Sequence, residues 1–177
     1  MGPRPEESIH GGAAIASALE TVDRIVGADA RRVFGWATVE LDRAERDLVA
    51  SFGRLSLAWS RDLADDTLLG ARCRLIASRP GLLEILLLEP VTEGRIAASL
   101  ARFDEGAVVV YVLVPTARLR DVLRDLRAAG LVLSGEGGGP FGREWLVTGS
   151  PRWGAHLCVA ESAEERAPVA GAATIGS

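Results

Sequence analysis

The sequence contains few cysteines, few aromatic residues and no long apolar run. Only two cysteines occur in 177 residues, and neither Cys73 nor Cys158 belongs to a CxxC motif or a Cys/His spacing typical of zinc sites. Because both lie in apolar segments, we expect two buried thiols in a reducing cytoplasm. No stretch of about 18 apolar residues is present, so no membrane span is predicted. The N-terminal segment MGPRPEESIHGG lacks the apolar core of a secretory signal, which agrees with a cytoplasmic location.

The sequence also lacks a concentration of basic residues. It has 20 Lys and Arg against 24 Asp and Glu, and the basic residues are scattered without interleaved aromatic side chains. Nucleic-acid binding therefore has no electrostatic support. Hydrophobic residues make up 48% of the chain, which is enough for one globular core at this length.

Nucleotide-binding and hydrolase motifs are absent or out of context. The segment GGGPFG at 137–142 formally matches GxGxxG, but Pro140 interrupts it and a strand pattern follows where a dinucleotide site needs a helix. We interpret the segment as a mobile loop that could cover a cleft. Neither GxxxxGK[ST] nor GxSxG occurs.

The middle of the chain shows the same order of elements twice. Apolar patterns in the first half predict a strand at 33–41, a helix at 42–52 and strands at 55–60, 67–78 and 82–88. After a linker helix at 92–103, the second half repeats the order with a strand at 107–114, a helix at 116–129 and strands at 131–134, 144–148 and 155–160. The predicted fold class is α+β: two βαβββ modules form one curved mixed sheet around a cleft, with the helices outside.

The expected domain organisation follows from this repeat. We expect flexible tails at 1–12 and 163–177, an N-terminal helix within 13–30, and one domain at 31–162 with modules at about 31–90 and 106–161. The N-terminal helix is amphipathic and should pack either on the domain or on a partner chain, so a homodimer is possible.

Three segments carry a resemblance to a known superfamily. They are ATVELDRAERDL, ILLLEPVTEGRIAASLARFDEG and LRAAGLVLSGEGGGPFGREWLVTGSPRWGAHLCVAES. Together they resemble the vicinal-oxygen-chelate proteins, which include glyoxalases, methylmalonyl-CoA epimerases, ring-cleaving dioxygenases and bleomycin-resistance proteins. The resemblance covers roughly residues 33–161 and implies the fold more strongly than any one activity.

Members of this superfamily that use a metal hold it with His, Gln or Glu on the first and last strands of each module. Strand-by-strand alignment places these positions on Trp36, Leu86, Val109 (or its neighbour Val108) and Cys158. None of these is a ligand for a hard divalent metal, although Cys158 alone could bind a softer one. The resemblance therefore implies no metal site, and we predict no cofactor.

Residues two positions away from a ligand position on the same strand point to the same side of the sheet, so they should line the same cleft. This phase adds Thr38 and Glu40 beside Trp36, Glu84 and Leu88 beside Leu86, Tyr111 and Leu113 beside Val109, and His156 beside Cys158. We predict Glu84, Tyr111 and His156 as catalytic groups. The predicted ligand-binding residues are Trp36, Thr38, Glu40, Leu86, Leu88, Val109, Leu113 and Cys158.

Each of these candidates has a purely structural alternative. Trp36 could fill the core instead of stacking on a ligand. Glu84 could form an ion pair with an arginine such as Arg72 or Arg74. His156 could be an exposed histidine without a function, and the Tyr111 hydroxyl could bond to another strand.

Three functions fit this predicted cleft. The first is a metal-independent isomerase, dehydratase or cyclase that uses general acid–base chemistry on a hydrophobic, polyketide-like or acyl-thioester compound in bacterial secondary metabolism. The second is a bleomycin-resistance-like protein that sequesters a hydrophobic or aromatic small molecule. The third is an interaction module with a closed cleft. An open cleft with an unpaired Glu84 favours the first, an open apolar cleft the second, and a cleft packed by Trp36, Leu86 and Val109 the third.

Overall fold

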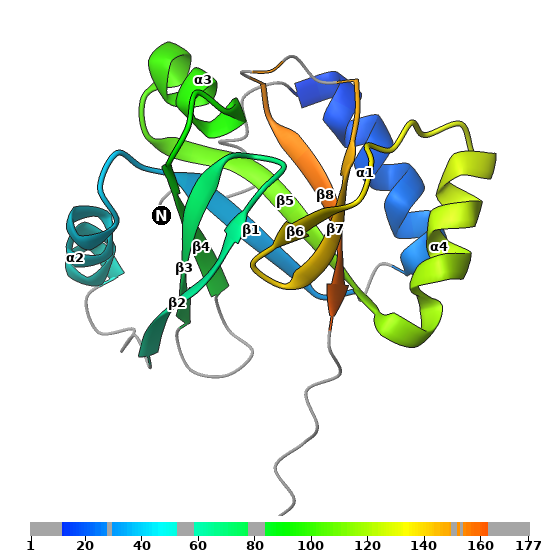
Figure 1. Cartoon of the computed structure of the whole chain (residues 1–177), viewed down its shortest axis with the longest axis horizontal. Coiled ribbons are helices and arrows are strands. Elements are labelled where there is room, and N and C mark those ends of the chain that lie inside the picture. The colour runs from blue at the N-terminus through cyan, green and yellow to red at the C-terminus, as the bar shows by residue number, and fades with distance from the viewer. Residues whose placement is uncertain are drawn as a thin grey trace, which may run out of the picture.

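A computed structural model describes residues 12–27, 30–52, 59–77, 84–149, 152 and 154–162 (Figure 1). The helices are α1 (Gly12–Val26), α2 (Leu41–Phe52), α3 (Arg95–Phe103) and α4 (Thr116–Ala128). The strands are β1 (Arg32–Ala37), β2 (Trp59–Asp66), β3 (Ala71–Ala77), β4 (Glu84–Pro90), β5 (Gly106–Pro115), β6 (Gly137–Gly139), β7 (Gly142–Val147) and β8 (His156–Ser162). No helix among these is long and apolar enough to cross a bilayer.

One curved mixed sheet contains all eight strands, in the order β2-β3-β4-β1-β5-β8-β7-β6. In each half, the first strand pairs in parallel with the last strand of the same half, β1 with β4 and β5 with β8. The remaining pairs are antiparallel, and β1–β5 joins the two halves. The two halves therefore have the same topology, which confirms the predicted fold class of two βαβββ modules.

Helices cover the outside of the sheet. Figure 1 shows α1 and α4 side by side at one flank and α2 at the opposite flank. Val22 and Val26 of α1 are buried with α4 and the outer faces of β5, β7 and β8, whereas α2 packs on β3 and β4. The N-terminal helix thus packs on the body of its own chain, one of the two arrangements that its amphipathic pattern allowed.

Two glutamate side chains end the first strand earlier than predicted and cap the helix that follows it. β1 ends at Ala37, because Thr38 and the Val39 amide both donate to the Glu105 carboxylate, at 2.7 and 2.8 Å. The Leu41 amide donates to Glu89 of β4 at 3.0 Å, which gives α2 an N-terminal cap that a sequence pattern does not contain.

The glycine-rich segment forms a β-hairpin, so its interpretation as a loop is wrong. Gly137–Gly139 pairs with Gly142–Glu144, and the turn between β6 and β7 holds Phe141. The strand predicted at 131–134 is reduced to one bridge at Leu133. Most of the strand predicted at 55–60 lies outside the described residues. The described strand β2 runs through polar residues to Asp66, because an edge strand needs only one apolar face.

Candidate functional site

The sheet encloses a packed interior to which both modules contribute. Leu86, Val109, Tyr111 and Cys158 are each 0% exposed within one apolar cluster. The interior around them is therefore closed. Leu86 and Val109 pack it as the interaction-module alternative requires, but Trp36 does not belong to it.

Most of the predicted cleft residues do face this interior. Leu86 and Leu88 of β4, Val109, Tyr111 and Leu113 of β5, and Cys158 of β8 all belong to the interior cluster. Their strand phase was predicted correctly because the resemblance placed ligand positions on Leu86, Val109 and Cys158, and residues two positions away share their face.

On β1, in contrast, the predicted phase is wrong by one residue. Trp36 packs beneath α2 against Leu41 and Ala44, on the outside of the sheet. The inward position is Gly35, where an added Cβ would lie 2.1 Å from Val109 Cγ1. A tryptophan has no room there, and a register shift in the β1–β5 pairing beside Gly35 places Val108 as well as Val109 inside.

Thr38, Glu40 and Glu84 also lie outside the interior. Thr38 is buried in the turn after β1, where it binds Glu105, and Glu40 is exposed before α2. Glu84 accepts two hydrogen bonds from Arg31, at 2.7 and 2.8 Å, at the partly exposed start of β4. The structural alternative for Glu84, an ion pair with arginine, is confirmed, although its partner is neither Arg72 nor Arg74.

The edge strands β2 and β6 of the curved sheet meet, and we call the resulting closed sheet the barrel. Two carboxyl groups that were not predicted lie inside it, and we call them the carboxyl pair. Asp66 ends β2 and is 1% exposed, and Glu144 lies on β7 and is 0% exposed. The Asp66 carboxylate accepts a hydrogen bond from the Tyr111 hydroxyl at 2.5 Å and another from the Leu69 amide at 2.7 Å. Burial raises the pKa of Tyr111 well above its ordinary value, so the hydroxyl keeps its proton and donates.

Glu144 has no such donors. Neither of its oxygens has a hydrogen-bond donor among the described residues. Burial, followed by the charge of the nearby Asp66, raises the pKa of Glu144 to about 9. No donor among the described residues stabilises a charge on Glu144, so this carboxyl keeps its proton at neutral pH.

His156 is buried at another level of the barrel. It is 1% exposed, and neither ring nitrogen has a hydrogen-bond partner in the described part of the chain. Burial, and then the charge of Arg95, lower the pKa of His156 to about 4, so the ring is neutral at pH 7. Glu144 pairs with Ala160, four residues beyond His156 on β8, which corresponds to roughly 13 Å along the strand. The structural alternative of an exposed His156 is therefore excluded, and the structure does not bring this residue together with Glu84.

The β6–β7 hairpin covers the carboxyl pair, and it contacts the first module at what we call the β2–β6 junction. There Thr67 donates twice to the Gly138 carbonyl, and the Gly138 amide donates back to the Thr67 hydroxyl at 3.0 Å. Leu68 packs so tightly on Gly137 that an added Cβ would lie 2.4 Å from its Cγ. Phe141 stacks edge-on against Tyr111, with ring centroids 5.5 Å apart. Because β2 and β6 are the two edges of the sheet, this junction closes the barrel.

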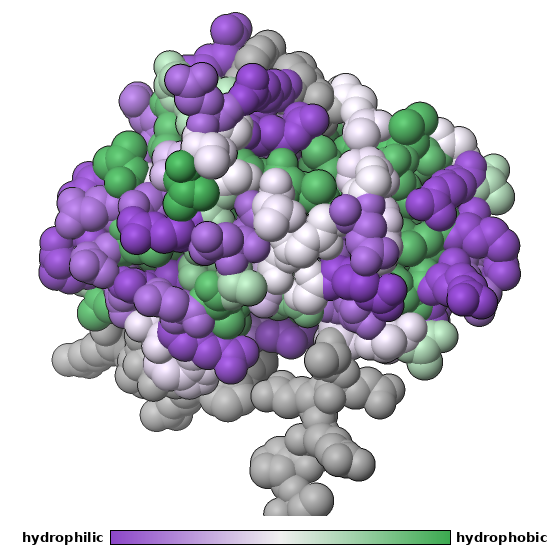
Figure 2. All heavy atoms as spheres, viewed as in Figure 1, coloured by the Kyte–Doolittle hydropathy of each residue, from purple (hydrophilic) through white to green (hydrophobic). Residues whose placement is uncertain are grey.

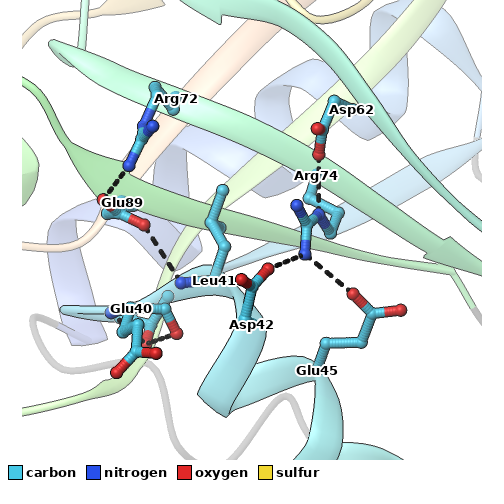
Figure 3. A network of polar contacts seen from close by, with 9 residues as sticks. Glu40, Leu41, Asp42, Glu45, Asp62, Arg72, Arg74 and Glu89 are labelled. Atoms are coloured by element: carbon cyan, nitrogen blue, oxygen red, sulfur yellow. Dashed lines mark hydrogen bonds and ion pairs between the residues drawn. The ribbon is translucent and has the colours of Figure 1, made fainter.

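A surface pocket of about 300 Å³ lies outside the barrel, between the start of α2 and strands β2 to β4. Figure 3 shows Arg74 in its wall reaching Asp42, Glu45 and Asp62, at 2.6 to 2.9 Å. Arg72 is bound to Glu89 in the same way. Both arginines already form ion pairs with carboxylates. The described residues that line this pocket therefore offer no free cation to an anionic ligand. Figure 2 shows that hydrophilic side chains dominate the face in view and separate small apolar patches.

The interior does not fit a divalent metal. The inward residues at the superfamily's ligand positions are Leu86, Val109 and Cys158, with Gly35 in place of Trp36. No group of three or more His, Cys, Asp or Glu with metal-binding geometry occurs among the described residues. We therefore derive no chemical step through a metal.

Comparison with solved structures identifies the fold. The chain is similar to methylmalonyl-CoA epimerase from Mycobacterium tuberculosis, with a TM-score of 0.58 and 22% identity over 74% of this chain and 86% of that one. A methylmalonyl-CoA epimerase variant from Streptomyces coelicolor, in complex with 2-nitronate-propionyl-CoA, gives a TM-score of 0.59 and 21% identity over 79% of this chain and 100% of that one. A hypothetical protein from Bacillus halodurans C-125 gives 0.57 and 20%, over 75% and 94%.

These similarities establish a vicinal-oxygen-chelate fold, as the sequence resemblance predicted. At identities below 25% they show the fold alone. No protein-family model matches the sequence, and no curated protein matches it either.

Proposed function

We propose that this protein is an acid–base isomerase for a compound with an acidic C–H bond beside a carbonyl group, of the acyl-thioester class. The observation that carries the proposal is the carboxyl pair: Glu144 is fully buried, has no hydrogen-bond partner among the described residues, and lies near the buried Asp66, whose charge helps to raise the pKa of Glu144. The structural neighbours that act on methylmalonyl-CoA support the substrate class.

The carboxyl pair is costly for a purely structural protein. A buried polar group without a hydrogen-bond donor destabilises the fold by about 1–3 kcal/mol, and an apolar side chain in its place would avoid this cost. An interaction module with a closed barrel needs no such pair. A buried carboxyl with a strongly raised pKa in an apolar interior, as Glu144 has, is instead typical of catalytic acids and bases.

The two carboxyls have complementary roles in this proposal. The Asp66 carboxylate, oriented by Tyr111 and the Leu69 amide, accepts the proton from the substrate carbon. Glu144, neutral at pH 7, donates its proton to the product. The low dielectric of the interior strengthens both interactions once water is excluded.

Access to the pair requires movement of the β6–β7 hairpin. Its contacts with the first module are the hydrogen bonds of Thr67 with Gly138 and the packing of Leu68 on Gly137. Separation of this small junction would open the barrel beside Asp66 without disturbing the β1–β5 pairing.

The first prediction is that Glu144→Gln abolishes proton exchange on an acyl-CoA probe. Purified protein is incubated in D2O with methylmalonyl-CoA or with 3-butenoyl-CoA, and deuterium at carbon is followed by mass spectrometry. We expect the natural protein to accelerate exchange of at least one probe and Glu144→Gln to lose about 100-fold or more of that rate. The matched control is Glu136→Gln, an exposed residue before the same hairpin, and it should retain full exchange.

Two results would contradict this proposal. Equal exchange by the natural protein and Glu144→Gln would remove Glu144 from the chemistry. Absence of exchange on every probe would leave the binding protein and the interaction module as the remaining functions. A binding protein would still be stabilised against unfolding by an aromatic or aliphatic ligand that fits its aliphatic interior.

A further inference from the structure

The Asp66 carboxylate is held by two donors of different origin. Its Oδ1 accepts a hydrogen bond at 2.7 Å from the Leu69 amide, within the turn that follows β2, and the Gly70 amide donates to the Asp66 carbonyl at 2.9 Å. Its Oδ2 accepts a hydrogen bond at 2.5 Å from the hydroxyl of Tyr111, which belongs to β5. The local turn therefore fixes the backbone and one oxygen, whereas the direction of the second oxygen depends on where the Tyr111 ring lies.

The Tyr111 ring lies close to both β1 and the β6–β7 hairpin. A Cβ added at Gly35 of β1 would be 3.4 Å from Tyr111 Cε2. Phe141, in the turn of the hairpin, meets the ring edge-on, with 5.5 Å between centroids and 69° between planes, which is a favoured arrangement of two aromatic rings. Movement of the hairpin would remove Phe141 and leave Gly35 in place, because β1 is paired with β5. Phe141 is therefore the contact that makes the position of Tyr111 depend on the hairpin.

This aromatic contact is separate from the β2–β6 junction. The junction joins residues 67–68 to residues 137–138 through hydrogen bonds and the packing of a leucine on a glycine. Truncation of the Phe141 side chain changes none of these groups, so the hairpin can stay closed while its contact with Tyr111 is lost. The two contacts can be tested independently, the junction for access to the interior and Phe141 for the alignment of Asp66.

We infer that Phe141 and Tyr111 are positioning residues for Asp66: closure of the hairpin places Phe141 on Tyr111, and Tyr111 then aligns the Asp66 carboxylate for proton abstraction. The inference rests on the proposed function, in which Asp66 takes the proton from the substrate carbon. A general base works only within hydrogen-bond reach of that proton, and a displacement of about 1 Å can cost on the order of 100-fold in rate. The hairpin thus completes the base as well as covering it.

The kinetic test compares Phe141→Ala, Tyr111→Phe and the double variant in the D2O exchange assay, with methylmalonyl-CoA and with 3-butenoyl-CoA as probes. We expect each single variant to lose about 10-fold or more in kcat while KM changes by less than about 3-fold, because the substrate still binds but the base is misaligned. If Phe141 acts through Tyr111, the double variant is no slower than Tyr111→Phe. The matched control is Phe103→Ala, a half-buried phenylalanine outside the apolar clusters of the described residues, which should keep the natural kcat and KM.

A second measurement does not depend on turnover. Tyr111 is the only tyrosine in the chain, so full-length protein labelled with 13C at tyrosine Cζ gives a single NMR signal. We expect Phe141→Ala to shift this signal and to speed exchange of the hydroxyl proton with water by about 10-fold or more, because the ring no longer holds the hydroxyl on Asp66. Phe103→Ala should leave both quantities unchanged, and urea unfolding verifies that each variant is folded.

The outcomes separate this inference from the proposed function. Exchange by the natural protein with an unchanged kcat in Phe141→Ala, or with a change in KM alone, would overturn the positioning role and leave acid–base isomerisation standing. A loss in the double variant equal to the product of the two single losses would do the same, as would an unchanged Tyr111 signal in Phe141→Ala. Absence of exchange by the natural protein on both probes would overturn the proposed function and, with it, the role of Asp66 as the base that Tyr111 aligns.

Discussion

At the scale of single residues, burial of Glu144 should appear in the pH dependence of stability. Its pKa is about 9 in the folded protein against 4.5 for the free side chain, so above pH 4.5 the unfolded chain ionises while the folded chain keeps its proton. The contribution of the protonated Glu144 to the free energy of unfolding is therefore complete below pH 4.5 and is lost as the pH rises toward 9. Between pH 6.5 and 8.5 we expect the free energy of unfolding to fall by about 2–3 kcal/mol.

Glu144→Gln should remove most of this slope, because a neutral amide does not titrate. Urea unfolding at several pH values measures it, and Glu136→Gln, at an exposed site, is the control that should keep it. Identical slopes for the natural protein and Glu144→Gln would mean that Glu144 is already charged in the folded state.

The residues of the carboxyl pair were not predictable from the sequence by the arguments used. Asp66 belongs to the polar stretch RDLADD, which indicates a turn or an exposed edge. Glu144 is the first residue of the strand predicted at 144–148, and strand ends are commonly exposed. Their burial depends on the pairing of distant edges, Thr67 with Gly138, which no local pattern contains. A signal was nevertheless present: Glu144 has the same alternation phase as Leu146, an inward residue.

At the scale of elements, the β6–β7 hairpin should control access to the interior. Gly137→Ala should loosen the β2–β6 junction, because the added Cβ would lie 2.4 Å from Leu68 Cγ. If opening of this junction limits access, we expect the exchange rate to rise by about 3-fold or more. Gly138→Ala is the matched control, since a Cβ there meets nothing within 4 Å, and it should leave the rate unchanged. An unchanged rate in Gly137→Ala would show that substrate enters elsewhere.

Element order and inward faces differ in how well the sequence determines them. The strands β4, β5 and β8 are apolar on both faces, and flanking helices fix which face is inward, so their phase was predicted correctly. β1 is short and carries Gly35 at its centre, so its most bulky residue, Trp36, was wrongly placed inside. A glycine in the middle of a strand is itself a signal of close approach, here by Val109.

At the scale of the whole molecule, the two modules should unfold together. The interior cluster contains Leu86 and Leu75 from the first module and Val109 and Leu146 from the second, all of them buried. Neither module keeps a closed core without the other, so the expectation of one domain at 31–162 leads to a single transition. Homodimer formation is a separate matter and stays a prediction.

Leu86→Ala provides the test of this cooperativity. Removing a fully buried leucine costs about 2–5 kcal/mol, and the loss should appear equally in both modules. Trp36 lies under α2 of the first module and Trp145 lies beneath α1 and α4 in the second. The chain has four tryptophans, so two variants in which either Trp36 or Trp145 is the only tryptophan left report on each half by fluorescence. We expect the two unfolding curves to coincide and to shift together in Leu86→Ala. If only the Trp36 curve shifts, the two modules unfold independently. Each module would then have to stay folded by itself when the barrel opens at the β2–β6 junction.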